Sequence, residues 1–326
     1  MKKIFYTILL FFILIMGLII FLPKKEDNKN LTTIKMSEVT HSIFYTPLYV
    51  AIENDYFKDE NINLELILTP GADKVSTAVL SGDTDIGFAG AESAIYIFDK
   101  NEKDYLRIFS GLTKRDGQFI LGRNNEKNFS LKKLYGKEIL VGRKSGMPAL
   151  NFLNALKKEN IDESKININY NIDFASLTGA FIGKTGDYVN LFEPNALKLE
   201  QEGYGYVLAN IGSLSGEMPY TTFYAKKSYI EKNEDIINGF IRAIDKGLKF
   251  TKENNEMTIA KVILPQFPDT SLNDVAKIVK RYKDADSFLD DHIVSEKLLN
   301  NLEDLLIDNK LLKNYVDYNK LIYIKK

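Results

Sequence analysis

The amino-acid sequence predicts an α/β fold of two lobes, each a mostly parallel sheet flanked by helices. Three observations predict this class. From residue 38 to 98, strands alternate with helices, and glycine-bearing turns follow the strands. The same alternation returns from residue 138 to 210, and it is typical of parallel sheets. Extended segments at 119–122 and 221–224 connect the two stretches, so a two-strand hinge is expected between the lobes.

Local signals place the elements of the first stretch. Pro47 suits the first turn of a helix, where its missing N–H costs nothing. Residues 62–68 are rich in branched side chains, which favour strands, and Gly82 ends a short helix. We expect strands at 33–39, 62–68, 85–89 and 105–112, helices at 47–56 and 73–80, and a third helix that ends near residue 98.

The second stretch repeats this pattern, and the tail is mainly helical. Residues 233–254 carry apolar side chains at helical spacing and predict a long amphipathic helix. In the second stretch we expect strands at 138–143, 166–170, 188–192 and 206–210, with helices at 148–160, 174–182 and 194–202. In the tail we expect a strand at 219–225 and further helices at 258–264, 271–282 and 295–307.

The two stretches also share a short phrase. Gly82-Asp83 leads through a strand to Glu92, and Gly186-Asp187 leads through a strand to Glu193. Both phrases read as a turn, a short strand and a carboxylate at the strand exit. This similarity indicates two lobes of like construction that face each other.

The composition excludes several functional classes. A net charge of −1 gives no basis for nucleic-acid binding, which usually needs a basic stripe. The chain has no cysteine, so it has no disulfide, thiolate metal site or thiol nucleophile. No serine nucleophile elbow, zinc helix motif or dinucleotide glycine fingerprint occurs. We therefore predict no catalytic residue and no cofactor, and expect a protein that is not an enzyme.

The N-terminal segment predicts attachment to a membrane. Residues 4–22 are uncharged and apolar, and at ~1.5 Å per residue their helix is about 28 Å long, close to the thickness of a bilayer core. No small-residue cleavage site follows, which favours an uncleaved anchor over a removed signal peptide. Without cysteine, a lipoprotein anchor is excluded. The expected organisation is an anchor at 1–25, a tether at 26–32, a first lobe at 33–119 and 219–326, and a second lobe at 120–218.

The carboxyl ends of the first-lobe strands predict one side of a ligand site, because the crevice of a parallel α/β sheet lies there. Aromatic side chains after the first strand are suited to sandwich a flat ring. His41 has no second histidine near it in sequence, so no metal site is predicted. The candidate ligand-binding residues of this lobe are His41, Tyr45, Gly71, Ala72, Gly90, Ala91 and Glu92.

The second lobe offers a glycine turn and a carboxylate. The N–H groups of the turn, with Ser145, suit an anionic or carbonyl oxygen, although the turn is also readable as an ordinary capped helix start. Glu193 either caps a helix N-terminus or accepts hydrogen bonds from the ligand, and the same alternatives hold for Glu92. Two such carboxylates favour an amino-substituted or cationic ligand. The candidates here are Ser145, Gly146, Met147 and Glu193, with Tyr220 and Thr221 at the return crossing.

Five segments carry a family resemblance. Residues 47–68, 71–92, 142–162, 186–194 and 218–233 resemble, in this order, substrate-binding proteins of ABC importers. The match is to the SsuA/THI5-like, or NMT1, family, which handles sulfonates, nitrate and thiamine-pyrimidine precursors. The resemblance implies a periplasmic-binding-protein-like fold and a monomeric, extracytoplasmic receptor that delivers a small molecule to an ABC permease and its ATPase.

The ligand class stays open between two alternatives. The carboxylates and aromatic residues favour a thiamine-pyrimidine-like nitrogen heteroaromatic, whereas the turn at Ser145 suits a sulfonate or nitrate-type oxyanion. Two further classes are a membrane-anchored sensor and a pyrimidine synthase of the THI5 type. The synthase uses a cysteine-rich iron-binding motif, which this chain lacks.

Overall fold

The computed structural model of the protein describes residues 31–100 and 102–324. The predicted anchor at 1–25, and the tether up to residue 30, lie outside the described residues. Within the described ranges, no helix is both long and apolar enough to cross a bilayer.

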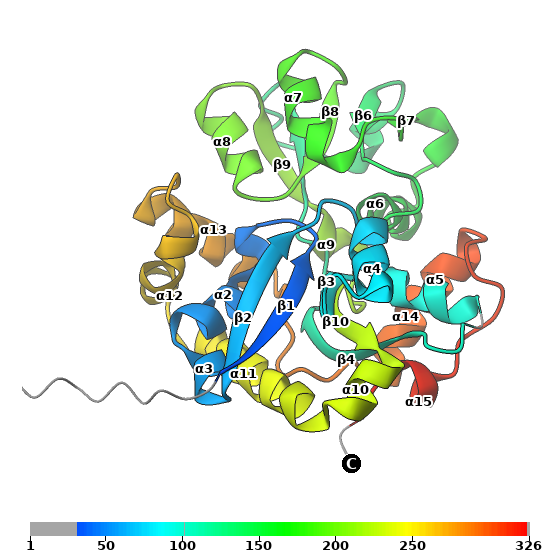
Figure 1. Cartoon of the computed structure of the whole chain (residues 1–326). Coiled ribbons are helices and arrows are strands. Elements are labelled where there is room, and N and C mark those ends of the chain that lie inside the picture. Colours follow the sequence, from blue (N-terminus) through cyan, green and yellow to red (C-terminus); the bar gives the residue numbers. More distant parts are fainter. Residues whose placement is uncertain (1–30, 101, 325–326) are drawn as a thin grey trace, which may run out of the picture. The chain divides into compact units, whose positions relative to one another are not determined.

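The first sheet holds five strands in the order β2-β1-β3-β10-β4 (Figure 1). β1 runs parallel to β2 and β3, and β10 runs antiparallel to β3 and β4. The register is set by pairs such as Met36 with Ile86 and Phe223 with Phe88. The strands are β1 (Thr32–Glu38), β2 (Ile62–Leu68), β3 (Ile86–Gly90), β4 (Leu106–Thr113) and β10 (Thr221–Lys226).

The second sheet has the same topology, with the order β7-β6-β8-β5-β9. β6 is parallel to β7 and β8, and β5 is antiparallel to β8 and β9. In each sheet the antiparallel strand is the one that follows a crossing from the other lobe. The strands are β5 (Phe119–Gly122), β6 (Glu138–Leu140), β7 (Asn167–Asn169), β8 (Tyr188–Leu191) and β9 (Tyr206–Asn210).

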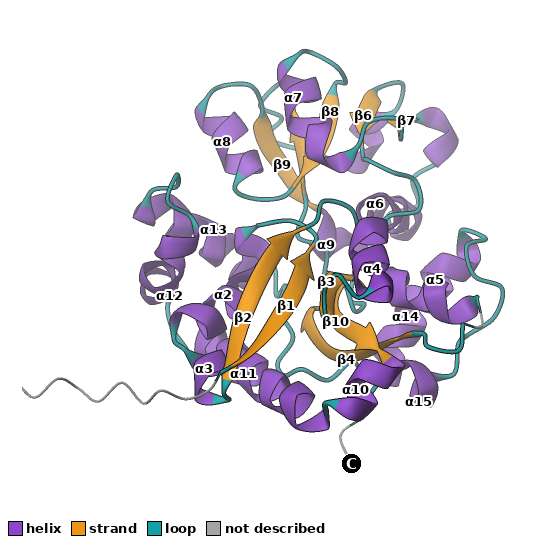
Figure 2. Ribbon diagram, in the orientation of Figure 1, coloured by secondary structure: helices purple, strands orange, loops and turns teal. Residues whose placement is uncertain are grey.

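Helices flank both sheets (Figure 2). The long helix α11 buries Ile237, Phe240, Ile244 and Leu248, as its apolar stripe predicts, and packs on α2. With the first sheet go α2 (Thr46–Glu53), α3 (Tyr56–Asp59), α4 (Ala72–Ser81), α5 (Glu92–Asp99), α10 (Lys227–Lys232), α11 (Glu234–Glu253), α12 (Glu256–Ile263), α13 (Leu272–Asp284), α14 (Glu296–Asp308) and α15 (Tyr318–Leu321). With the second sheet go α6 (Met147–Lys158), α7 (Leu177–Ile182), α8 (Asn195–Gln201) and α9 (Ile211–Ser215).

Two local predictions need correction. The helix expected at 47–56 is two helices, because Asp55 takes a left-handed conformation with φ of 57° between α2 and α3. Residues 174–182 begin as a 3-10 turn, η4 (Phe174–Ser176), and become α-helical only at α7. The short helices α9, α10 and α15 were not predicted, since each has six residues or fewer and too little sequence for a helical period to show.

The repeated phrase aligns differently from what its letters indicate. The Lys35 N–H donates to Asp85 Oδ2 at 2.9 Å, and the Glu138 N–H donates to Asp187 Oδ2 at 3.0 Å. Asp85, and not Asp83, is therefore the counterpart of Asp187. Each aspartate carboxylate accepts from a backbone N–H of the neighbouring strand, at the point where the two strands begin to pair. The sheets match as predicted, but Glu92 lies one residue further from its aspartate than Glu193 does.

Two crossing segments connect the lobes and run side by side. One leads from β4 to β5, and the other leads from α9 to β10. The Met218 N–H donates to the Lys114 carbonyl at 2.9 Å, and the Tyr220 N–H donates to the Thr113 carbonyl at 3.0 Å. The fold is thus the predicted two-lobed α/β class with a two-strand hinge, and one apolar core cluster extends from the first lobe into the second.

Candidate functional site

The end of β3 meets the start of α6 where the two lobes touch. Gly90 ends β3, and a Cβ placed on it would lie 2.0 Å from Glu92 Oε2 and 2.7 Å from Met147 Cγ. Only a glycine leaves room there for the carboxylate and for the methionine of the opposite lobe. Gly90, Ala91, Glu92 and Met147, all predicted site residues, are therefore gathered at one point of the lobe interface.

Four polar side-chain atoms near this point are buried and make no well-formed hydrogen bond, although the Tyr220 hydroxyl lies close enough to Asp116 to influence the pKa of that carboxyl. They are Glu92 Oε2, Ser93 Oγ, Tyr220 Oη and Thr222 Oγ1. Their residues are at most 6 % exposed. Buried polar groups are nearly always hydrogen-bonded, because an unpaired one costs about 1–3 kcal/mol. Such a concentration of unpaired polar atoms beside the lobe interface suits a ligand that brings complementary donors and acceptors.

Glu92 is the charged member of this group. Burial raises the pKa of the Glu92 carboxyl to about 7, against the opposing effects of its own N–H, of Arg143, and of the Met147 and Ser93 N–H groups. The carboxyl therefore titrates near neutral pH, and it lies at the N-terminus of α6. Helix N-termini attract anions, so Glu92 already occupies the position that an oxyanion would take there.

A second buried carboxyl, Asp116, lies in the crossing segment between β4 and β5. It is fully buried, and the Gln118 N–H donates to its Oδ1 at 2.6 Å. Burial raises the pKa of Asp116 to about 8, although the Gln118 N–H and the Tyr220 hydroxyl oppose the shift. Sequence reasoning missed this residue, since it stands in a short connection without periodicity or motif.

Aromatic rings fill the space between the lobes beside these carboxyls. The Phe44 ring centroid lies 5.3 Å from that of Phe192 and 5.7 Å from that of Tyr220. Tyr45 packs edge-on against Phe88 at 4.4 Å. Burial raises the pKa of the Tyr45 hydroxyl, the Thr221 hydroxyl opposes the shift, and the carboxyls of Glu38, Glu92 and Asp116 raise it further. The predicted residues Tyr45, Tyr220 and Thr221 therefore belong to the same neighbourhood as Glu92.

Asn190 adds an amide to the polar atoms of the second lobe. It lies on β8, which leads to Glu193, and its side chain is fully buried. Neither Nδ2 nor Oδ1 makes a hydrogen bond. Sequence reasoning missed Asn190, although an asparagine within an otherwise apolar strand is a signal for a buried polar site.

Glu193 has a very different environment from Glu92. Its Oε2 accepts from the Leu197 N–H at 2.7 Å, which caps α8, and its Oε1 accepts from Arg281 of α13. Burial works against the Arg281 charge, but Glu193 and Glu200 outweigh it and raise the pKa of Arg281. Both carboxylate oxygens of Glu193 are thus engaged by protein groups.

His41 points to the edge of the first lobe and not to the buried cluster. Its Nδ1 lies 3.1 Å from Glu38 Oε2, and its Nε2 lies 2.9 Å from the Gln266 carbonyl oxygen. The Glu38 hydrogen bond raises the pKa of His41, burial lowers it, and the Gln266 carbonyl raises it further, so the net shift is upward. Both ring nitrogens already have acceptors beside them.

The remaining predicted residues lie along one edge of the interface. Gly71 and Ala72 start α4, where Asp73 forms a 3.0 Å ion pair with Arg143 of the second lobe. The Tyr96 hydroxyl donates to the Ser145 carbonyl at 3.2 Å, and Gly146 precedes α6. These contacts join the lobes at the backbone of the predicted turn.

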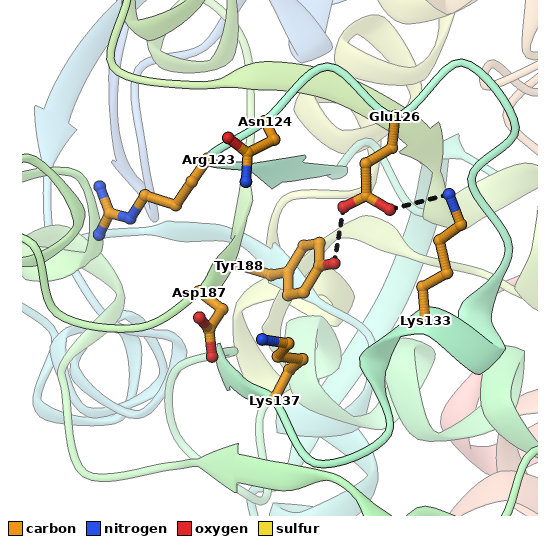
Figure 3. A pocket seen from close by; sticks show the side chains of 7 residues that line it. All are labelled: Arg123, Asn124, Glu126, Lys133, Lys137, Asp187 and Tyr188. Atoms are coloured by element: carbon orange, nitrogen blue, oxygen red, sulfur yellow. Dashed lines mark hydrogen bonds and ion pairs between the residues drawn. The ribbon is translucent and has the colours of Figure 1, made fainter.

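A surface pocket of about 330 Å³ lies elsewhere, in the second lobe. The Tyr188 hydroxyl donates to Glu126 Oε1 at 2.7 Å, and Lys133 pairs with Glu126 at 3.0 Å. None of the predicted site residues lines it, and its tyrosine comes from the start of β8, away from the strand exit. Figure 3 shows the lining residues Arg123, Asn124, Glu126, Lys133, Lys137, Asp187 and Tyr188.

In the part of the chain that the structure describes, no three histidine or carboxylate side chains are grouped so that they could hold a metal ion.

Comparisons with known proteins address the fold and the family. The chain is 39% identical to the Bacillus subtilis (strain 168) protein YtlA, which is named a binding protein by inference, over 91% of this chain and 89% of that protein. The alkanesulfonate-binding protein SsuA of Xanthomonas axonopodis pv. citri, solved with MOPS, matches with a TM-score of 0.71 at 16% identity, covering 89% of this chain and 98% of that one.

A second solved structure is similar to this chain over a comparable length. The periplasmic aliphatic sulphonate-binding protein SsuA of Escherichia coli matches with a TM-score of 0.68 at 17% identity, over 89% of this chain and 97% of that one. At such identities these likenesses establish the fold, the periplasmic-binding-protein architecture. The sequence model of the NMT1/THI5-like family matches residues 43–257. Together with the 39% identity to YtlA, this match shows that the chain belongs to the NMT1/THI5-like family.

Proposed function

We propose that the protein is an extracytoplasmic solute-binding receptor of an ABC-type importer, and that it captures an amine-bearing ligand between its two lobes. The single observation that carries the proposal is the Glu92 carboxyl, which is buried at the lobe interface and has an oxygen with no hydrogen-bond partner. Family membership supports the role, and the names of the SsuA structures identify those proteins as sulfonate binders.

The chemistry of the cluster favours a cationic or N–H-rich ligand. Both buried carboxyls, Glu92 and Asp116, gain from a positive charge or from donors placed against them, because an unpaired buried charge is costly. The rings of Phe44, Phe192 and Tyr220 suit a flat heterocycle. A nitrogen heteroaromatic such as a thiamine-pyrimidine precursor combines both properties.

A sulfonate or nitrate-type ligand is the alternative within the same class of importer. It would need the N–H groups at the start of α6, and the Met147 N–H there already lowers the pKa of the Glu92 carboxyl. An added anion would meet like charge at close range, which costs several kcal/mol at a dry interface. The arrangement therefore supports the cation.

The proposed mechanism is capture by closure. Polar groups of the first lobe, from α5 and β10, lie against the start of α6 in the second lobe, so a ligand held among them contacts both lobes. A ligand with more contacts in the closed form shifts the population toward that form. We assign no chemical step to any residue, and the YtlA relative is likewise named for binding. The closed receptor would then deliver its ligand to a permease and an ATPase subunit.

A thermal-shift screen of the purified full chain tests this function. The probes are 4-amino-5-hydroxymethyl-2-methylpyrimidine, ethanesulfonate and nitrate. A ligand at ~100 times its Kd adds about 2.7 kcal/mol to the free energy of unfolding. We expect a shift with the aminopyrimidine only. A shift with ethanesulfonate or nitrate alone would overturn the ligand class, and turnover of the aminopyrimidine would overturn the receptor role.

A further inference from the structure

We infer that Glu193 and Arg281 form a latch that holds the two lobes together and sets how readily the protein closes, so that Glu193 is a positioning residue and not a ligand contact. This inference deepens the proposed function and rests on it for ligand affinity. The lobe-closure part stands without any ligand.

Every polar group of Glu193 already has a protein partner. Besides the two carboxylate bonds, its N–H donates to Tyr282 Oη at 3.0 Å, and its carbonyl accepts from Ser42 Oγ at 2.6 Å. The Glu193 side chain is fully buried. A ligand would therefore have to share or displace one of these protein partners.

Most of the partners of Glu193 belong to the first lobe. Arg281 and Tyr282 lie on α13, which packs on α12 and on the 3-10 turn η1 (Ile43–Tyr45) of the first lobe. Ser42 precedes η1. Glu193 follows β8 of the second lobe. Three of its four polar contacts therefore cross from one lobe to the other, and only the bond from the Leu197 N–H stays within its own lobe.

Helix α13 also contacts the hinge. The Tyr282 hydroxyl donates to the Gly117 carbonyl at 3.1 Å, in the crossing segment between β4 and β5. Arg281 Nη2 donates to Glu200 Oε2 at 3.0 Å on α8. One turn of α13 thus contacts α8 of the second lobe through Arg281 and the backbone of the crossing segment through Tyr282. Separation of the second lobe from α13 on opening would break the Arg281 bonds to Glu193 and Glu200 together.

The consequence is a defined effect on binding. A receptor whose binding-competent form is partly populated has an apparent Kd equal to the intrinsic Kd divided by that population. Loss of the latch lowers the closed population for every ligand alike. It weakens all affinities by one common factor and leaves the ratio between two ligands unchanged, whereas loss of a ligand contact changes that ratio.

The experiment measures closure first in the absence of ligand. Because the natural chain has no cysteine, Lys132→Cys and Lys249→Cys on exposed surfaces of the two lobes accept spin labels specifically. We expect the interlobe distance distribution of the full chain to widen toward longer distances in Arg281→Met and in Glu193→Gln. The matched control is Lys277→Met, one turn earlier on α13, whose amine only approaches Glu200 at 3.9 Å. It should leave the distribution unchanged.

The affinity arm uses two aminopyrimidines that differ in one substituent, measured by calorimetry. We expect Arg281→Met and Glu193→Gln to weaken both ligands by the same factor, about tenfold, with their ratio kept. Tyr282→Phe, which loses only a hydroxyl, gives a second and milder variant if either of the others fails to fold. Unchanged ligand-free distances in all of these variants, or a changed ligand ratio in Glu193→Gln, would overturn the latch. Failure of every aminopyrimidine to bind the natural chain would overturn the ligand proposal alone, since the ligand-free distances would still report the latch.

Discussion

Glu92 and Glu193 stand at equivalent edges of the two sheets, each just beyond a central parallel strand, yet they live in opposite environments. Glu92 has a buried oxygen with no partner, and burial brings its pKa to about 7. Glu193 has an arginine on one oxygen and a helix N–H on the other. The comparison indicates that the end of a strand provides a position for a carboxylate, whereas the residues that pack against it from the other lobe determine its role. We therefore propose different roles for the two carboxylates: Glu92 faces the ligand, and Glu193 holds the lobes together.

The pH dependence of stability should separate the two residues most strongly. A carboxyl whose folded pKa is about 7, raised from its ordinary 4.5, holds more protons in the folded state between these values. The free energy of unfolding therefore falls as pH rises through this window, and Asp116 acts in the same direction up to about pH 8. At ~1.4 kcal/mol per pKa unit, Glu92→Gln should be more stable than the natural chain by roughly 3 kcal/mol at pH 8 and nearly equal to it at pH 4.

Urea unfolding of the ligand-free protein from pH 4 to pH 8 measures this difference. Burial also raises the pKa of Glu193, although the Arg281 charge opposes the shift. Any gain in stability of Glu193→Gln at pH 8 should therefore be smaller than that of Glu92→Gln, because Arg281 would lose a charged partner. Destabilisation by Glu92→Gln at pH 8 would contradict the assignment of an unpaired carboxyl.

Ligand affinity should divide the pair next. Glu92→Gln removes the charge that we assign to the ligand amine, so calorimetry should show a loss of about 100-fold for a cationic aminopyrimidine. The matched control is Glu303→Gln on α14, another buried glutamate with an unpartnered oxygen, which lies outside the lobe interface cluster. It should change stability and leave affinity as it is. Equal losses in the two variants would argue against Glu92 as the anchor.

Most of the fold could be predicted from the sequence, because strand and helix periods are local signals. β2 and β9 have the predicted bounds. The segments expected as crossings, 119–122 and 221–224, are instead part of β5 and β10 inside the two sheets, and the connections between the lobes lie just before these strands. The sequence comparison aligned Asp83 with Asp187 because both follow a glycine. In the structure Asp85 is the counterpart of Asp187, because each of these two carboxylates accepts from a backbone N–H of the neighbouring strand.

The site could be predicted less well, for a physical reason. The structure brings Tyr45, Glu92, Met147, Tyr220 and Thr221 into one neighbourhood, and their contact with a ligand stays a prediction. Asp116 was missed because a short crossing carries no pattern. The partners of Glu193 were missed because α13 lies about ninety residues further along the chain, and only tertiary packing brings Arg281 to it.

Space at the end of β3 gives a sharper test of the Glu92 environment. Gly90→Ala would place a methyl group 2.0 Å from Glu92 Oε2 and 2.7 Å from Met147 Cγ, which forces the carboxyl or the second lobe to move. We expect about a tenfold loss of ligand affinity, since overpacking of a close contact costs roughly 1–3 kcal/mol. Gly179→Ala, where nothing lies within 4 Å, is the control and should bind normally. Normal binding by Gly90→Ala would show that the contact is not part of the site.

The smallest expected effect concerns Ser42. Ser42→Ala removes the 2.6 Å bond to the Glu193 carbonyl and the cap on the Phe44 N–H. A lost hydrogen bond of this kind is worth about 1 kcal/mol, so ligand affinity should weaken by about threefold to fivefold through the closed population. Calorimetry alongside Ser130→Ala, whose side chain makes no cap bond, isolates the effect. A loss as large as that of Glu92→Gln would place Ser42 on the ligand.

The central claim, that Glu92 faces the ligand and Glu193 does not, is tested most directly by calorimetry from pH 5 to pH 8 with a permanently charged aminopyrimidinium. Its charge is fixed, so any pH dependence of affinity belongs to the protein. The claim predicts affinity that rises with pH up to about 7 in the natural chain and in Glu193→Gln, and a flatter profile in Glu92→Gln. A pH profile that survives in Glu92→Gln and disappears in Glu193→Gln would contradict it.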